Sequence, residues 1–227
     1  MPMSRSIFIG ATAFLISACI IAQEPDNSLS CFFTLFFSSL LGTIRATEEM
    51  VMGQVVLYLA ISVDGYLADE QGGVDWLSGD GSEPDAPGSY PAFLDAVDAI
   101  VMGWTTYHQL VTELSPDSWP YEGRPSYVVT HRQKEDLENI FFWNGDLTAL
   151  VDKLKESHEG NVWICGGASV AGQLLKEGCI DKLWLSIIPT VLGKGVRLFP
   201  ELPRELPLKL VGTEHWNGIV DLVYEKR

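Results

Sequence analysis

Three short segments carry residues whose types and spacing suit the binding of phosphate groups. Each follows an apolar run: residues 103–106 follow "DAIVM", residues 130–132 follow "SYVV", and residues 166–170 follow "NVWIC". Glycine allows close approach to the backbone, and the first turn of a helix offers N–H groups to phosphate oxygens. Arg132 adds a fixed positive charge. Two potential phosphate-binding turns and a separate cation predict a phosphorylated dinucleotide as the ligand. The alternative is that the three segments are routine turns and that the arginine is an ordinary surface residue.

The three segments can lie close together only if the strands before them are parallel, because the carboxyl ends of parallel strands lie at the same edge of a sheet. Apolar runs alternate with helix-like segments from residue 53 on, and Asn217-Gly218 predicts a closing antiparallel hairpin. The fold class is therefore α/β with a mixed, mostly parallel sheet, in which ligands bind at the carboxyl ends of the strands. The predicted strands are 54–61, 98–103, 126–132, 139–143, 161–166, one from 180 that ends near Pro189, 208–216 and 219–227. The predicted helices are 90–97, 104–110, 146–157 and a segment that starts after 167.

Composition excludes several classes of function. The formal net charge of −15 argues against a nucleic acid partner. The four cysteines lack metal-ligand spacing and the four histidines are scattered, so neither a metal site nor a disulfide framework is expected. A small-molecule partner remains compatible with the acidic charge, because a local pocket can be basic or lined by backbone N–H groups.

Residues 1–52 differ in character from the remaining chain. They contain two apolar runs separated by "QEPDNS". Three interpretations stay open: a misassigned start with the true one at Met50 or Met52, a targeting or anchor segment, or a structured extension. Association with a membrane is expected only if this segment belongs to the working protein. The functional domain is predicted to span residues 53–227.

Five motifs in order resemble the dihydrofolate reductase-like superfamily, and within it the bacterial group that includes the reductase domain of riboflavin biosynthesis (the RibD C-terminal domain). The motifs are "AISVDGYLA", "VMGWTTY", "VVTHR", "ICGGASV" and "DKLWLSIIPTVLGKGVRLF". The resemblance implies a three-layer sandwich with an eight-stranded sheet, an NADPH-dependent oxidoreductase and a homodimer. NADPH in turn implies a cytoplasmic location.

The resemblance also implies which residues bind NADPH. Gly166 and Gly167, which the family joins by a cis peptide, match the glycines beside the nicotinamide and pyrophosphate, and residues 130–132 match the turn at the 2′-phosphate. The implied cofactor-binding residues are Ala60, Gly103, Trp104, Thr105, Thr106, Thr130, His131, Arg132, Gly166, Gly167, Ala168, Ser169 and Val170.

Two departures from the family pattern bear on the cofactor and on the substrate. Trp104 stands where the family usually has arginine or lysine, so one charge contact to the cofactor's phosphates is missing. Helix 90–97 lacks a carboxylate at the position that binds the pterin in folate reductases. Dihydrofolate is therefore not expected as substrate. The implied reaction is hydride transfer to a C=N or C=O bond of a small molecule. The alternatives are the 5-amino-6-(5-phosphoribosylamino)uracil reductase of riboflavin biosynthesis and a nucleotide-binding module without turnover.

The candidates for substrate contact each have a structural alternative. Asp64 belongs to an Asp-Gly turn, which is more often structural. Trp76 can line the site or pack down the long acidic segment 62–89, and Tyr107 can face the cleft or the core. Leu67 completes the set. The resemblance places Lys194 and Arg197 near the substrate's phosphoribityl group or at the dimer contact, and the alternative is a solvated loop. No residue is identified as the proton donor.

Overall fold

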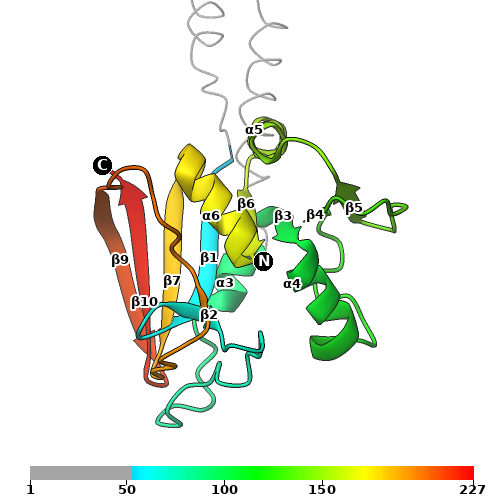
Figure 1. The fold of residues 1–227 in the computed structure, drawn as a ribbon. Helices are drawn as coiled ribbons and strands as arrows, with labels where there is room; N and C mark the ends of the chain where they lie inside the picture. Colours follow the sequence, from blue (N-terminus) through cyan, green and yellow to red (C-terminus); the bar gives the residue numbers. More distant parts are fainter. Residues whose placement is uncertain (1–52) are drawn as a thin grey trace, which may run out of the picture. The chain divides into compact units, whose positions relative to one another are not determined.

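The computed structural model describes residues 53–227, and in them strands and helices alternate in the predicted order (Figure 1). The three interpretations of residues 1–52 lie outside the described part. Within 53–227, no helix combines the length and apolar character needed to cross a membrane. The strands are β1 (Val55–Ser62), β2 (Tyr66–Ala68), β3 (Val97–Gly103), β4 (Ser126–Val129), β5 (Ile140–Trp143), β6 (Asn161–Gly166), β7 (Lys182–Ile188), β8 (Val196–Arg197), β9 (Leu208–Trp216) and β10 (Ile219–Lys226). The helices are α3 (Tyr90–Asp95), α4 (Trp104–Gln109), the π-helix η1 (Leu110–Leu114), α5 (Leu147–Ser157) and α6 (Ala168–Glu177).

Eight of the strands form one sheet in the order β5-β4-β3-β6-β1-β7-β10-β9. Every neighbouring pair from β5 to β7 is parallel, whereas β10 runs antiparallel to β7 and to β9. The hairpin between β9 and β10 turns at Asn217 and Gly218, both with positive φ, as a two-residue turn of this type requires. The predicted mixed, mostly parallel eight-stranded sheet with a C-terminal antiparallel hairpin is confirmed.

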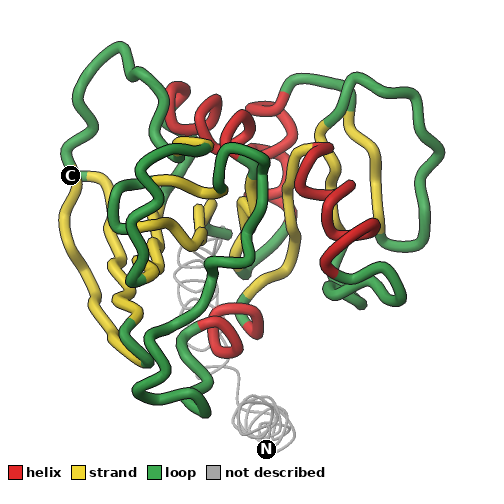
Figure 2. The backbone as a smooth tube through the Cα atoms, turned by 60° about the horizontal axis from the view of Figure 1, so that its bottom comes forward, coloured by secondary structure: helices red, strands yellow, loops and turns green. Residues whose placement is uncertain are grey.

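The sheet separates two helical layers (Figure 2). Successive side chains of β1 point to opposite faces: Leu57 packs with α5 and α6 in one buried cluster, whereas Tyr58 packs with Phe93 of α3 and Tyr107 of α4 in the other. The sequence predicts α5 well, because the Asp146 carboxylate caps it by accepting a hydrogen bond of 2.8 Å from the backbone N–H of Thr148. The result is the expected three-layer sandwich.

The segment 62–89 is more ordered at its start than the sequence indicates. Its residues 66–68 form β2, which pairs antiparallel with β8, so the prediction of an irregular segment is wrong there. Side chains hold the two together: the Arg197 guanidinium donates to the Tyr66 hydroxyl at 2.9 Å and lies 4.7 Å from the centre of its ring. Arg197 is thus a partner of Tyr66, whereas the Lys194 side chain remains 77% exposed.

Candidate functional site

The three turns predicted to bind phosphate lie at one edge of the sheet, because β4, β3 and β6 are adjacent and parallel. The turns after β3 and β6 also pack closely. A side chain at Gly103 would place its Cβ 3.2 Å from Cγ2 of Val170, and one at Gly167 would place its Cβ 3.2 Å from Oγ1 of Thr106. The two glycines therefore allow the turns to approach each other and leave their backbones uncovered.

The helices that follow these turns begin without a side-chain cap. Gly103 and Gly167 are the N-caps of α4 and α6 and provide no side chain to accept from the first N–H groups. The peptide bond between Gly166 and Gly167 is cis. α4 passes directly into η1, so both turns open onto extended helical segments. Such N-termini favour an anion, and this edge therefore fits the pyrophosphate of a dinucleotide.

The third turn follows β4 and supplies positive charge. β4 ends at Val129, so Thr130, His131 and Arg132 lie in the turn and not in the strand as predicted. The buried Thr130 hydroxyl accepts from the Arg132 backbone N–H at 3.1 Å, and Nδ1 of His131 lies 3.1 Å from Oδ1 of Asn144. These bonds fix the backbone of the turn and leave the Arg132 guanidinium exposed.

Two cationic side chains lie over the ring of Trp104 at this turn. The Arg132 guanidinium lies 4.8 Å and the Lys134 ammonium 5.3 Å from the centre of the Trp104 ring, within the range of cation–π attraction. Since Trp104 replaces a basic residue of the family pattern, the sequence indicates a lost charge. The fold instead brings a second cation to the Trp104 ring, and Lys134 is a residue that sequence reasoning missed.

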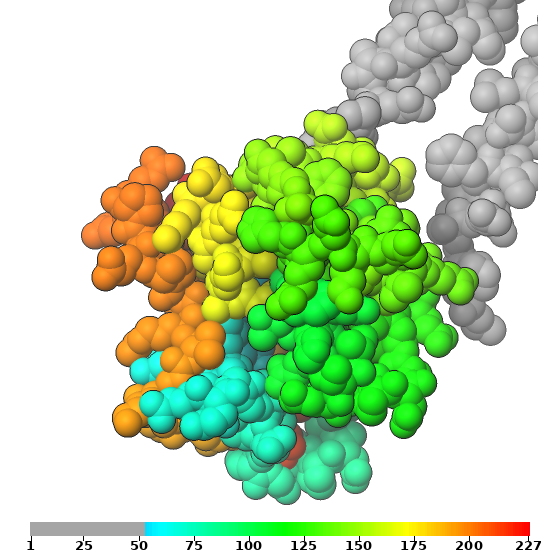
Figure 3. Space-filling model, turned by 45° about the vertical axis from the view of Figure 1, so that its right-hand side comes forward, coloured from blue at the N-terminus to red at the C-terminus, as the bar shows by residue number. Residues whose placement is uncertain are grey.

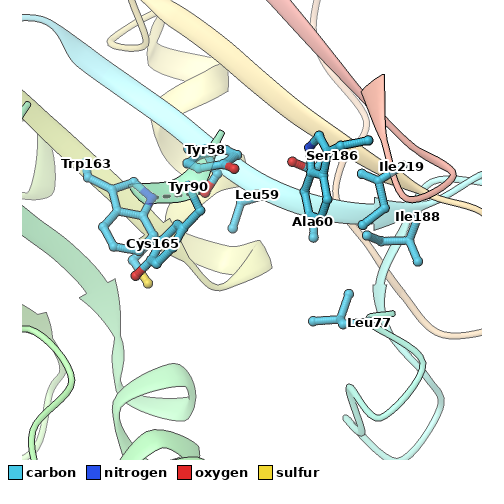
Figure 4. Close-up of a pocket in the computed structure, with 11 residues that line it drawn as sticks. Tyr58, Leu59, Ala60, Leu77, Tyr90, Trp163, Cys165, Ser186, Ile188 and Ile219 are labelled. Atoms are coloured by element: carbon cyan, nitrogen blue, oxygen red, sulfur yellow. Dashed lines mark hydrogen bonds between the residues drawn. The ribbon is translucent and has the colours of Figure 1, made fainter. Parts of the chain in front are cut away.

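A pocket of about 310 Å³ opens beside these turns. Figure 3 shows the surface hollowed where α4 (green), α6 (yellow) and the segment 62–89 (cyan) meet, and Figure 4 shows the pocket's side chains. The pocket adjoins the turn after β6, because Cδ2 of Leu59 lies 3.4 Å from the position of a Cβ at Gly166. Its lining is mostly aromatic and aliphatic: Tyr58, Leu59, Ala60, Leu77, Tyr90, Trp163, Cys165, Ser186, Ile188, Trp216 and Ile219.

None of the four predicted substrate-contact residues lines this pocket. The Asp64 carboxylate accepts from the Ser62 hydroxyl and from the backbone N–H groups of Leu192 and Gly193 at 2.7–3.1 Å, which ties its turn to the loop before β8. These bonds also lower the pKa of Asp64, the Ser62 bond most.

The other three candidates pack against protein. The Trp76 indole N–H donates to the Gly73 carbonyl at 3.2 Å, and its neighbour Leu77 reaches the pocket instead. Tyr107 is buried against Phe142, and Leu67 packs on the core. Of the residues predicted for the nicotinamide side, Ala60 lines the pocket.

A buried carboxylate behind the pocket was not predicted. Asp221 of β10 is 0% exposed and accepts from the hydroxyls of Ser89 and Ser186, each at 2.5 Å. The indole N–H of Trp216 lies 3.3 Å from the same carboxylate. One sequence signal was available: Asp221 occupies an inward position of an alternating strand, two residues after the buried Ile219.

Cys165 faces the pocket as a neutral thiol. Burial raises its pKa to about 11, although the Tyr121 hydroxyl 3.6 Å from the sulfur opposes the shift. Because the thiolate is the nucleophile and a raised pKa keeps the thiol protonated, we expect iodoacetamide to modify Cys165 more slowly than free cysteine at neutral pH. The rate should still rise with pH beyond the ordinary thiol pKa. Mass spectrometry of the Cys165 peptide measures it; modification as fast as that of N-acetylcysteine would contradict the expectation.

A mixed eight-stranded sheet between two helical layers, with uncapped glycine turns beside an aromatic pocket, defines the dihydrofolate reductase-like class of α/β proteins. The chain matches the family described as "RibD C-terminal domain" over residues 54–222 and belongs to that family. It is 37% identical over 172 residues to the protein YwjB of Bacillus subtilis (strain 168), covering 75% of this chain and 97% of YwjB.

Solved structures share this architecture. A candidate riboflavin biosynthesis protein from Shewanella sp. PV-4 superposes with a TM-score of 0.66 at 28% identity, covering 77% of this chain and 99% of that one. Dihydrofolate reductase from Enterococcus faecalis, solved in complex with NADP(H), superposes with a TM-score of 0.56 at 17% identity, covering 77% of this chain and 97% of that one. The second similarity concerns the fold alone.

Proposed function

We propose that the protein is an NADPH-dependent reductase that acts on a C=N or C=O bond of a small, flat molecule. The observation that carries the proposal is the position of the turns after β3, β4 and β6 at one sheet edge, directly beside an aromatic pocket of about 310 Å³. An anion site and an apolar pocket in contact are what a dinucleotide and its reaction partner require. Membership of the RibD C-terminal domain family supports the same conclusion.

Different residues of the chain would bind different parts of NADPH and the substrate. The first turns of α4 and α6 would hold the pyrophosphate, and Arg132 with Lys134 would hold the 2′-phosphate. When bound, NADPH supplies a hydride. Leu59 and Ala60 of β1 line the pocket, and Leu59 also lies beside Gly166 in the turn after β6, so they would position the nicotinamide against the substrate. The aromatic lining would exclude water and stack on a planar ring.

A substrate without a phosphate group fits the pocket better than a phosphoribosyl compound. None of the residues that line the cavity is lysine or arginine, and Arg197 of β8 is held by Tyr66. Phosphate in a pocket calls for such a cation or for clustered N–H groups. The aminouracil reductase activity of riboflavin biosynthesis is therefore the second candidate, favoured by the family and by the Shewanella structure.

The test is the oxidation of NADPH by the full chain, followed by absorbance over a panel of imines, ketones, pteridines and the phosphoribosylaminouracil. Substrate-dependent oxidation with NADPH preferred to NADH is the expected result. Saturable NADPH binding without oxidation of any panel member would favour the binding module without turnover. Absence of NADPH binding would overturn the proposal.

A further inference from the structure

Four polar side chains of the pocket lining direct their protons to acceptors of the protein and not into the pocket: Tyr58, Trp163, Ser186 and Trp216. An ionised carboxylate only accepts hydrogen bonds, so the Ser186 hydroxyl and the Trp216 indole donate to Asp221. Ser89 also donates to Asp221. The Tyr58 hydroxyl, 2.9 Å from Oγ of Ser89, is then left to donate to Ser89.

The remaining indole of the lining follows the same pattern. The Trp163 N–H donates to the backbone carbonyl of Tyr58 at 3.0 Å. Within residues 53–227, no lysine, arginine or histidine forms an ion pair with Asp221, so its charge is met by neutral donors alone. Tyr58 and Ser186 line the inner wall of the pocket (Figure 4). Their oxygens, Tyr58 Oη and Ser186 Oγ, each keep a lone pair to accept from a ligand, and the buried Asp221 carboxylate lies behind them.

We propose that this wall selects ligands that present an N–H donor, such as an aromatic amine or an amidine, and that Asp221 is the positioning residue that sets this preference. The inference deepens the proposed function, since it names the substrate class of the same pocket. Asp221 acts through the hydroxyls and is itself shielded from the pocket by them. A ligand with an acceptor or a methyl group at this place would leave the two oxygens unsatisfied, which is costly in a buried site.

The test compares two flat probes of equal size, 2-aminoquinoline and 2-methylquinoline, in buffer alkaline enough to keep both uncharged. Binding to the full chain is followed by the fluorescence of the tryptophans in the absence of NADPH. We expect 2-aminoquinoline to bind about tenfold more tightly, as one buried hydrogen bond allows. Equal affinity for the two probes would overturn the proposal.

The Asp221→Asn variant tests the role of the carboxylate. The amide donates an N–H to one of the serines, so a hydroxyl proton becomes free to point into the pocket, and the preference should fall to about threefold or less. Glu214→Gln is the matched control, because Glu214 is exposed and pairs with Asp221 across the β9–β10 ladder; it removes the same charge and should keep the preference. An unchanged preference in Asp221→Asn would overturn the role of Asp221.

A second variant keeps the test decisive if Asp221→Asn does not fold, as judged by circular dichroism. Ser186→Ala removes one acceptor and leaves the carboxylate in place, and it should also lower the preference for 2-aminoquinoline. A preference that survives this change would contradict the proposal. Because no cofactor is present, failure of the reductase assignment would appear only in the NADPH assay and failure of this inference only in the ratio of the two probes.

Discussion

The Arg132→Ala variant is expected to bind NADPH about 30-fold more weakly than the unchanged chain, with NADH affinity altered by less than about twofold. The guanidinium is exposed at the edge where the turns after β3, β4 and β6 meet, and it fits a phosphate in a bidentate manner. NADH lacks the 2′-phosphate, so its affinity should hardly respond. Fluorescence titration with each nucleotide measures the ratio.

Trp104 makes this prediction specific to the present chain. Its ring lies beneath Arg132 and Lys134, so Trp104→Ala should release both cations and lower the preference for NADPH, whereas Trp104→Phe should retain part of it. Arg204→Ala is the matched control, because it removes an exposed arginine from the segment between β8 and β9. An equal loss of NADPH and NADH binding in Arg132→Ala would show that Arg132 does not read the 2′-phosphate.

The sheet and the positions of the turns after β3, β4 and β6 were predictable because each rests on a local pattern. A buried parallel strand is a continuous apolar run, and each of the three runs ends at a glycine or at a threonine followed by a cation. The strand order β5-β4-β3-β6-β1-β7-β10-β9 was not predicted, because parallel pairing alone does not fix which strands are neighbours. Residues such as Gly103 and Gly167 could be singled out because each lies between an apolar run and a helix-like segment, which is a local pattern.

The pocket was less predictable because its parts come from distant segments. Asp221 is hydrogen-bonded to Ser89 and Ser186, which are 132 and 35 residues away in the sequence. No spacing pattern in the sequence indicates such a long-range contact. The same holds for β2 and β8, which have three and two residues and depend on Asp64 and Arg197 bonding across the gap. Lys134 reaches Trp104 only because the turn after β4 folds back over the start of α4.

The Gly166→Ala variant is expected to remain folded but to bind NADPH about 100-fold more weakly and to lose most of its activity. Gly166 has φ of 120°, a conformation that costs other residues about 1–3 kcal/mol. Its added Cβ would lie 3.4 Å from Cδ2 of Leu59 and 3.8 Å from Oγ1 of Thr106. The methyl group would therefore stand between the pocket and the first turn of α4, where the nicotinamide and pyrophosphate must pass close to the backbone.

A second glycine separates the effect on the site from the effect of backbone strain. Gly178 ends α6 in the left-handed conformation with φ of 70°, and no atom lies within 4 Å of its Cβ position. Gly178→Ala should therefore lower the free energy of unfolding by about 1 kcal/mol and leave NADPH affinity unchanged. If both variants are destabilised to the same extent but only Gly166→Ala binds NADPH more weakly, the backbone at Gly166 contacts the cofactor. Retention of full NADPH affinity by Gly166→Ala would place the dinucleotide elsewhere, because a methyl group at that position cannot share the space with it.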